Sequence, residues 1–70
     1  MKYSIVIETA GKNYSAYSPD VPGCIATGKT INEAKENLQK ALEFHIQGLK
    51  EDGLPVPEPA SQVDYLTVSV

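Results

Sequence analysis

The sequence predicts an α+β domain in which three short strands precede one long helix and a last strand follows it. Two observations support this order. Apolar and polar residues alternate with a period of two in short segments, as is typical of strands. One longer segment instead repeats its apolar residues every three or four positions, as an amphipathic helix does. We therefore expect a two-layer β-β-β-α-β fold, an antiparallel meander with one helix packed on one face, formed by a single domain over residues 1–70.

The first three strands are predicted from alternation and from the turns between them. Residues 2–9 (KYSIVIET) alternate and are rich in β-branched side chains. Residues 10–13 (AGKN) hold a glycine and an asparagine, which tolerate positive φ, so residues 14–18 should return as a hairpin. Residues 24–29 (CIATGK) form the third predicted strand, in which Gly28 marks a bulge or a close approach of another backbone.

The helix has recognisable signals at both ends. Thr30 and Glu33 match a capping box, in which Thr30 accepts from the amide of Glu33 and the Glu33 carboxylate reaches back to the amide of Thr30. Gly53 suits a left-handed residue after the last turn, and Pro55 prevents continuation. The expected apolar face comprises Ile31, Ala34, Leu38, Ala41, Leu42, His45, Ile46 and Leu49.

A stiff connector and a last strand complete the chain. Residues 54–61 (LPVPEPAS) hold three prolines and should be extended, and residues 63–70 alternate as a strand. Because one helix covers one sheet face, the opposite face stays bare and carries Val6 and Tyr17 or their alternates. We expect a partner on that face or at an edge strand.

Composition and size narrow the class of protein. The net charge of −3 disfavours nucleic-acid binding by this chain and favours a basic protein partner. Cys24 is the only cysteine, so no disulfide forms within the chain, and no apolar run approaches a membrane span. We expect a cytoplasmic protein without a membrane segment. A core from about 70 residues supplies only a few kcal/mol, so self-association into a dimer or tetramer is also expected.

The segment between the second and third strands, Pro19-Asp20-Val21-Pro22-Gly23, is named the corner here. Its prolines fix φ, so it can redirect the chain, and a preorganised loop can also bind a partner at lower entropic cost. Tyrosines in the adjoining strand offer a large apolar body with one polar tip, which suits interfaces. The candidate partner-interface residues are Tyr14, Tyr17, Pro19, Asp20 and Pro22.

Several residues have functional and structural interpretations. Glu8 and Asp20 could be remnants of a two-metal nuclease site, but too few carboxylates accompany them, and Asp20 after a proline can bond local turn amides. His45 is expected to be a partly buried structural histidine and Cys24 a small core residue. No catalytic residues, metal site or cofactor are therefore expected.

Three motifs together resemble one family. The corner PDVPGC, the helix start GKTINEA and the Gly-x-Pro-x-Pro of residues 53–57 look like the HicB-type antitoxin family. The resemblance implies a degenerate ribonuclease-H-like fold with the last strand beside the first, in the order 3-2-1-4. It also implies that the chain neutralises a small, basic, mRNA-cleaving toxin of the HicA type by covering its active site.

The resemblance leaves alternatives open. Many family members carry a C-terminal DNA-binding segment, whereas this chain stops at Val70, so operator binding by this chain is not expected. One alternative is a solitary homo-oligomeric module that binds another protein or a small ligand. The other is a residual metal-dependent nuclease.

Overall fold

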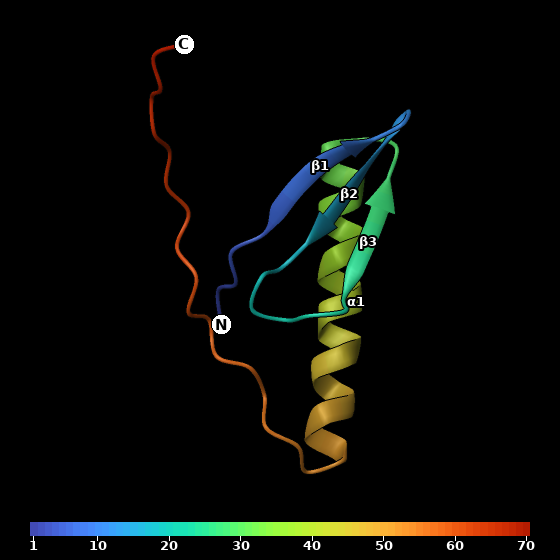
Figure 1. The fold of residues 1–70 in the computed structure, drawn as a ribbon. Helices are drawn as coiled ribbons and strands as arrows, with labels where there is room; N and C mark the ends of the chain where they lie inside the picture. The colour runs from blue at the N-terminus through green and yellow to red at the C-terminus, as the bar shows by residue number, and fades with distance from the viewer.

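A computed structural model describes residues 1–70 and confirms the α+β layering (Figure 1). The elements are β1 (Val6–Ala10), β2 (Asn13–Tyr17), β3 (Ile25–Gly28) and α1 (Ile31–Glu51). The three strands form one antiparallel sheet in the order β1-β2-β3. The helix lies against one face of this sheet and extends past its end (Figure 1).

The β1–β2 hairpin has the predicted position, but β1 is shorter than the predicted strand. The pairing runs from Ala10 opposite Asn13 to Val6 opposite Tyr17. Beyond Tyr17 the chain turns into the corner, where Pro19 has no N–H to donate to a ladder. Residues 2–5 therefore extend past the end of their partner strand and begin no ladder of their own.

The sheet has one covered face and one bare face. Ala16 on β2 is fully buried beneath α1, and its Cα partners are Ile7 on β1 and Ala26 on β3. Because side chains alternate along a strand, Tyr17 and its partners Val6 and Ile25 lie on the opposite face. The prediction that Val6 and Tyr17, or their alternates, occupy the bare face is confirmed for Val6 and Tyr17.

Both predicted ends of α1 are confirmed, with one change in detail. Thr30 is the N-cap, and its hydroxyl accepts from the amide of Glu33 at 3.0 Å. The Glu33 carboxylate accepts from the amide of Lys29 at 3.1 Å, not from that of Thr30 as predicted. At the other end Gly53 has φ 68°, and Leu54 donates to the carbonyl of Leu49, as in a Schellman motif.

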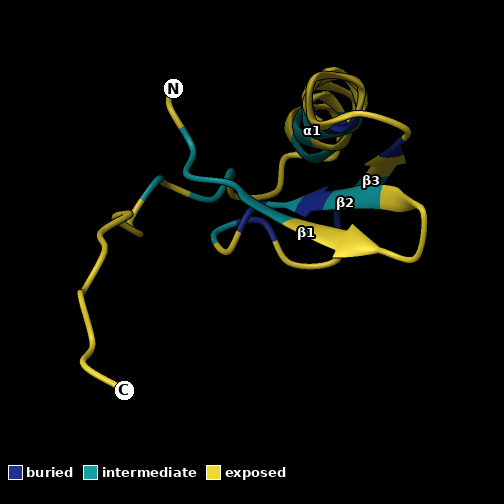
Figure 2. Cartoon of the chain, turned by 90° about the horizontal axis from the view of Figure 1, so that it is seen from above, coloured by how far each residue is buried: buried dark blue, intermediate teal, exposed yellow.

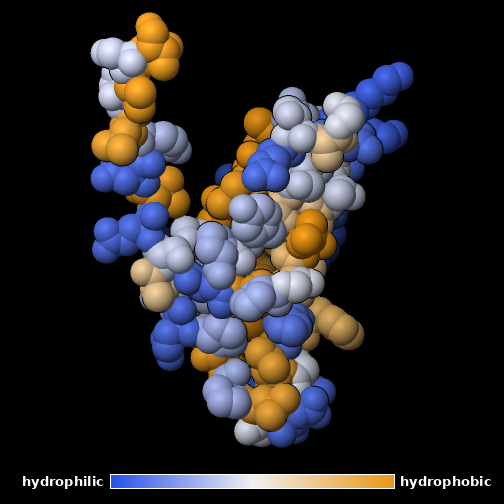
Figure 3. All heavy atoms as spheres, in the orientation of Figure 1, coloured by the Kyte–Doolittle hydropathy of each residue, from blue (hydrophilic) through white to orange (hydrophobic).

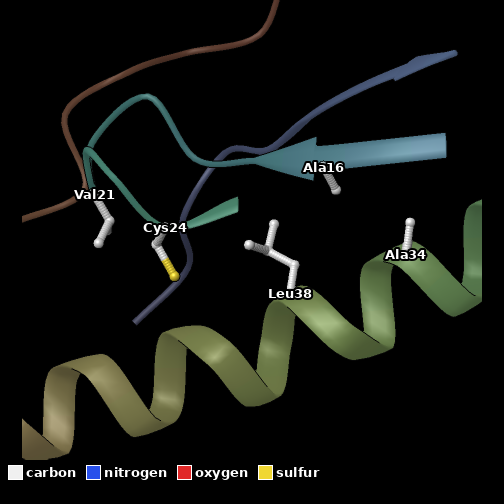
Figure 4. Packing of buried hydrophobic residues seen from close by; sticks show 5 residues of the cluster. All are labelled: Ala16, Val21, Cys24, Ala34 and Leu38. Carbon is white, nitrogen blue, oxygen red and sulfur yellow. The ribbon is translucent and has the colours of Figure 1, made fainter. Parts of the chain in front are cut away.

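A small core joins the corner, β2 and α1. Its buried side chains are Ala16, Val21, Cys24, Ala34 and Leu38 (Figure 4). Leu38 points from α1 toward the space between Ala16 and Cys24 (Figure 4). Cys24 is a buried free thiol, as predicted. Gly28 is also buried, and a Cβ there would lie 2.5 Å from the amide nitrogen of Ala34, which confirms the predicted close approach.

The predicted fourth strand is wrong for the single chain. Residues 54–70, named the tail here, contain no helix or strand, and residues 61–70 are all exposed. The tail leaves the domain instead of pairing beside β1 (Figures 1 and 2). Hydrogen bonds to residues 57–61, described below, hold the start of the tail so that its end points away from the sheet. The order 3-2-1-4 is therefore not formed, and the ribonuclease-H-like description depends on a strand that is absent here.

Candidate functional site

The bare face presents a row of apolar side chains next to the corner. Val6, Tyr17 and Ile25 are aligned across the three strands by the sheet register. Val6 and Tyr17 are half-buried, while Ile25 is 65% exposed. The next row toward the hairpin, Glu8, Ser15 and Thr27, is polar. Figure 3 looks onto this face, which no helix covers. An apolar row with a polar border is typical of a protein-binding surface.

The corner extends this row into a shallow hollow of about 310 Å³. Tyr17, Pro19 and Pro22 line it together with Ile25, so the structure brings three of the candidate residues to one place. The corner is anchored from within, because Val21 is buried in the core and its amide donates to the carbonyl of Ser18 at 3.2 Å. Both prolines of the corner are exposed on a loop that is held in shape.

Tyr14 does not belong to this surface. It lies on the same side of β2 as Ala16 and packs against the core cluster. The two tyrosines therefore face opposite sides of the sheet, as the odd spacing between them predicts. In this single chain Tyr14 has a packing role, and Tyr17 is the tyrosine available on the bare face.

Asp20 holds the tail. Its carboxylate accepts from the amides of Ala60 and Ser61, each at 3.1 Å, and from the Ser61 hydroxyl at 2.8 Å. The expected bonds to local turn amides are absent, and the amides that reach the carboxylate instead lie 40 and 41 residues along the chain. These bonds, the Ser61 amide first, lower the pKa of Asp20 below its ordinary value of 3.8. We name this contact the clasp.

A second contact holds the tail at a point closer in sequence to the end of α1. The Tyr3 hydroxyl donates to the carbonyl of Pro57 at 2.6 Å. Together with the clasp, it ties residues 57–61 to the N-terminal segment and to the corner. The tail beyond Ser61 then stands apart from the body as an arm with alternating apolar and polar side chains (Figure 3).

The remaining titratable residues do not gather into a site. No group of three or more His, Cys, Asp or Glu side chains lies close enough together to hold a metal ion. Glu8 is exposed on β1, apart from the clasp of Asp20. His45 is exposed, so its prediction as partly buried is wrong. No helix has the length and apolar character that crossing a membrane requires.

Two exposed apolar residues were not among the sequence-based candidates. Ile25 belongs to the bare face, and alternation from the buried Cys24 places it there. Phe44 is 84% exposed on α1, outside the predicted apolar face and away from the bare face of the sheet. In both cases the available signal was an apolar residue out of phase with the core positions of its element.

Comparison with known proteins gives one family over nearly the whole chain. A family model described as "HicB_like antitoxin of bacterial toxin-antitoxin system" matches residues 3–69. A 14.9 kDa protein from the rep-hol intergenic region of Haemophilus phage HP1 is 44% identical over 64 residues, which cover 89% of this chain and 48% of that protein. The chain therefore spans about half the length of this phage relative.

Two solved structures share the fold. One is a chain of a HicA3 and HicB3 toxin–antitoxin complex, with a TM-score of 0.72 and 32% identity, covering 86% of this chain and 70% of that one. The other is the N-terminal domain of the antitoxin HicB from Burkholderia pseudomallei, with a TM-score of 0.75 and 29% identity, covering 87% and 73%.

Proposed function

The chain belongs to the HicB-like antitoxin family, and on that premise we propose that it neutralises a small HicA-type toxin by occluding the toxin's RNA-cleaving surface. The observation that carries the proposal is the match to a chain of a HicA3–HicB3 toxin–antitoxin complex. The net charge of −3 supports it, since an acidic chain attracts a basic partner and hastens their encounter.

The surface proposed to contact the toxin is the apolar row on the bare face together with the corner. Tyr17, Pro19 and Pro22 surround one hollow, and Ile25 adds exposed apolar area beside them. A large aromatic next to a rigid loop is the kind of contact that dominates interface energies. The anchored corner would lose little entropy on binding, because Val21 already fixes its shape.

Inhibition is proposed to require no chemistry from this chain. The carboxylate of Asp20 is occupied by hydrogen bonds from its own tail. Incubation of the purified chain with RNA and Mg²⁺ or Mn²⁺ tests this point. We expect intact RNA; metal-dependent cleavage that disappears in Asp20→Asn or Glu8→Gln would instead establish a nuclease.

The direct test of binding uses a purified HicA-type toxin, titrated with the chain in a calorimeter. We expect a saturable complex whose affinity weakens when Tyr17 is replaced. The same proposal places this chain in the cytoplasm, where the toxin would cleave mRNA. If no complex forms while the chain still self-associates, a solitary homo-oligomeric module is the correct description.

A further inference from the structure

The tail carries a strand pattern without a sheet to bury it. Leu66, Val68 and Val70 recur at every second residue, so an extended chain places them on one side. Leu66 is 91% and Val68 71% exposed, and Figure 3 shows hydrophobic side chains along the separate arm. A continuous apolar edge on an unpaired segment is a surface that pairs with another chain unless something covers it.

The sheet has an unpaired edge along β1 that could accept such a strand. The sheet order β1-β2-β3 leaves β1 paired on one side only, so the N–H and C=O groups along its other side have no strand partner. The segment before β1, residues 2–5, continues that free edge beyond the end of β2. Tyr3 and Ile5 from this segment face the helix side and pack against the core cluster.

A groove of about 830 Å³ lies between this edge and α1. The helix packs mainly on β3 and β2, so the helix-facing side of β1 and of residues 2–5 is left partly open. Leu38, Leu42 and Ile46 of α1 line the groove opposite Tyr3 and Ile5. A strand added beside β1 would lie about 4.8 Å from it and would turn every second side chain into this groove.

The tail of the same chain does not occupy this groove. The clasp between Asp20 and Ser61 and the bond from Tyr3 to Pro57 hold the segment before residue 62. From there the chain heads away from the sheet and the helix (Figures 1 and 2). Each copy therefore has both a free strand, aimed outward, and a free edge with an open groove.

We propose that residues 62–70 of one copy form a fourth strand along the free edge of β1 in a second copy, with Leu66, Val68 and Val70 in its groove. Because each copy has one tail and one acceptor edge, the exchange is reciprocal and closes as a two-fold dimer. The inference rests on the self-association expected of this small domain, and it does not depend on the toxin.

The test uses the full chain in solution. Light scattering coupled to size exclusion should give the mass of a dimer. In a mixture of ¹³C-labelled and unlabelled chain, isotope-filtered NOEs should connect the methyl groups of Leu66 in one copy to Ile5 or Leu42 in the other. Contacts found only within one chain, or none, would overturn the exchange without relying on any variant.

A pair of variants gives an independent reading. Leu66→Asp with Val68→Asp should raise the dimer dissociation constant about 100-fold or more, because two apolar side chains leave the groove and two charges replace them. The control, Thr67→Asp with Ser69→Asp, places the charges on the other side of the strand and should retain the dimer. If the first pair of substitutions leaves the dimer unaffected, the strand exchange is refuted but self-association is not. If the wild-type chain is a monomer, both the exchange and self-association are refuted. Toxin binding is measured separately.

Discussion

Ser61 donates twice to the carboxylate of Asp20, from its amide at 3.1 Å and from its hydroxyl at 2.8 Å, across 41 residues of sequence. This contact connects the corner to the tail, whose residues 61–70 are all exposed. The clasp thus decides the point at which the tail leaves the body and the direction in which its strand-like end is presented.

Replacing Asp20 by asparagine should release the tail. The amide side chain keeps the size of the carboxylate but loses its charge, and charge-assisted hydrogen bonds are the stronger ones. We expect the Ser61 amide to exchange hydrogen several-fold faster, with the exchange of α1 amides unchanged. Equal protection of Ser61 in both proteins would show that the clasp does not hold the tail.

The clasp should also depend on pH. Since the hydrogen bonds from Ser61 and Ala60 lower the pKa of Asp20, the carboxylate form stabilises the clasped state. That stabilisation is fully present above the ordinary value of 3.8 and is lost as the pH falls through the lowered pKa. NMR titration of the Asp20 carboxyl carbon should give a midpoint below 3.8, tracked by the Ser61 amide shift. A midpoint at or above 3.8 would contradict the clasp.

Gly28 should tolerate no side chain. A Cβ at this position would lie 2.5 Å from the Ala34 nitrogen and 2.8 Å from the carbonyl carbon of Glu33, and both belong to the helix backbone. We expect Gly28→Ala to reduce the free energy of unfolding by about 1–3 kcal/mol in urea titrations. The matched control is Gly48→Ala, which meets nothing within 4 Å and should stabilise α1 by about 0.5–1 kcal/mol. Equal effects of the two changes would mean that α1 does not approach β3 as described.

Two large apolar residues of α1 should differ in their contribution to stability. Leu38 is 1% exposed in the core, whereas Phe44 is 84% exposed. Leu38→Ala should lower the free energy of unfolding by about 2–5 kcal/mol, enough to unfold much of so small a domain. Phe44→Ala should change it by less than about 0.5 kcal/mol. A large loss for Phe44→Ala would show that self-association covers this side chain.

The local features were predictable from the sequence and the long-range ones were not. Thr30, Glu33 and Gly53 act through neighbours within a few residues, and alternation limited the bare face to Val6 and Tyr17 or their alternates. The partner of Asp20 is 40 or 41 residues away, so turn chemistry suggested the wrong amides. Residues 63–70 have a strand pattern, but a pattern does not specify which edge accepts the strand or in which copy. The exposure of His45 and Phe44 could not be predicted from the sequence, because it depends on which turns of α1 the sheet covers.

Tyr17 is the sharpest single test of the proposed interface. Tyr17→Ala should weaken toxin binding about 10-fold or more while lowering the melting temperature only modestly, because the side chain lies half-buried on the bare face. Thr27→Ala, on the polar row of the same face, is the control and should leave both quantities nearly unchanged. Unchanged affinity with a large loss of stability would assign Tyr17 to the core.

The most direct measurement is the toxin's RNA cleavage as the chain is added. A purified HicA-type toxin is incubated with mRNA while the chain is titrated from sub-stoichiometric amounts to an excess. Neutralisation by occlusion predicts that cleavage falls in proportion to the chain added and ends near equivalence, with Tyr17→Ala shifting the curve to higher concentration. Undiminished cleavage at a large excess of folded chain would contradict the antitoxin proposal.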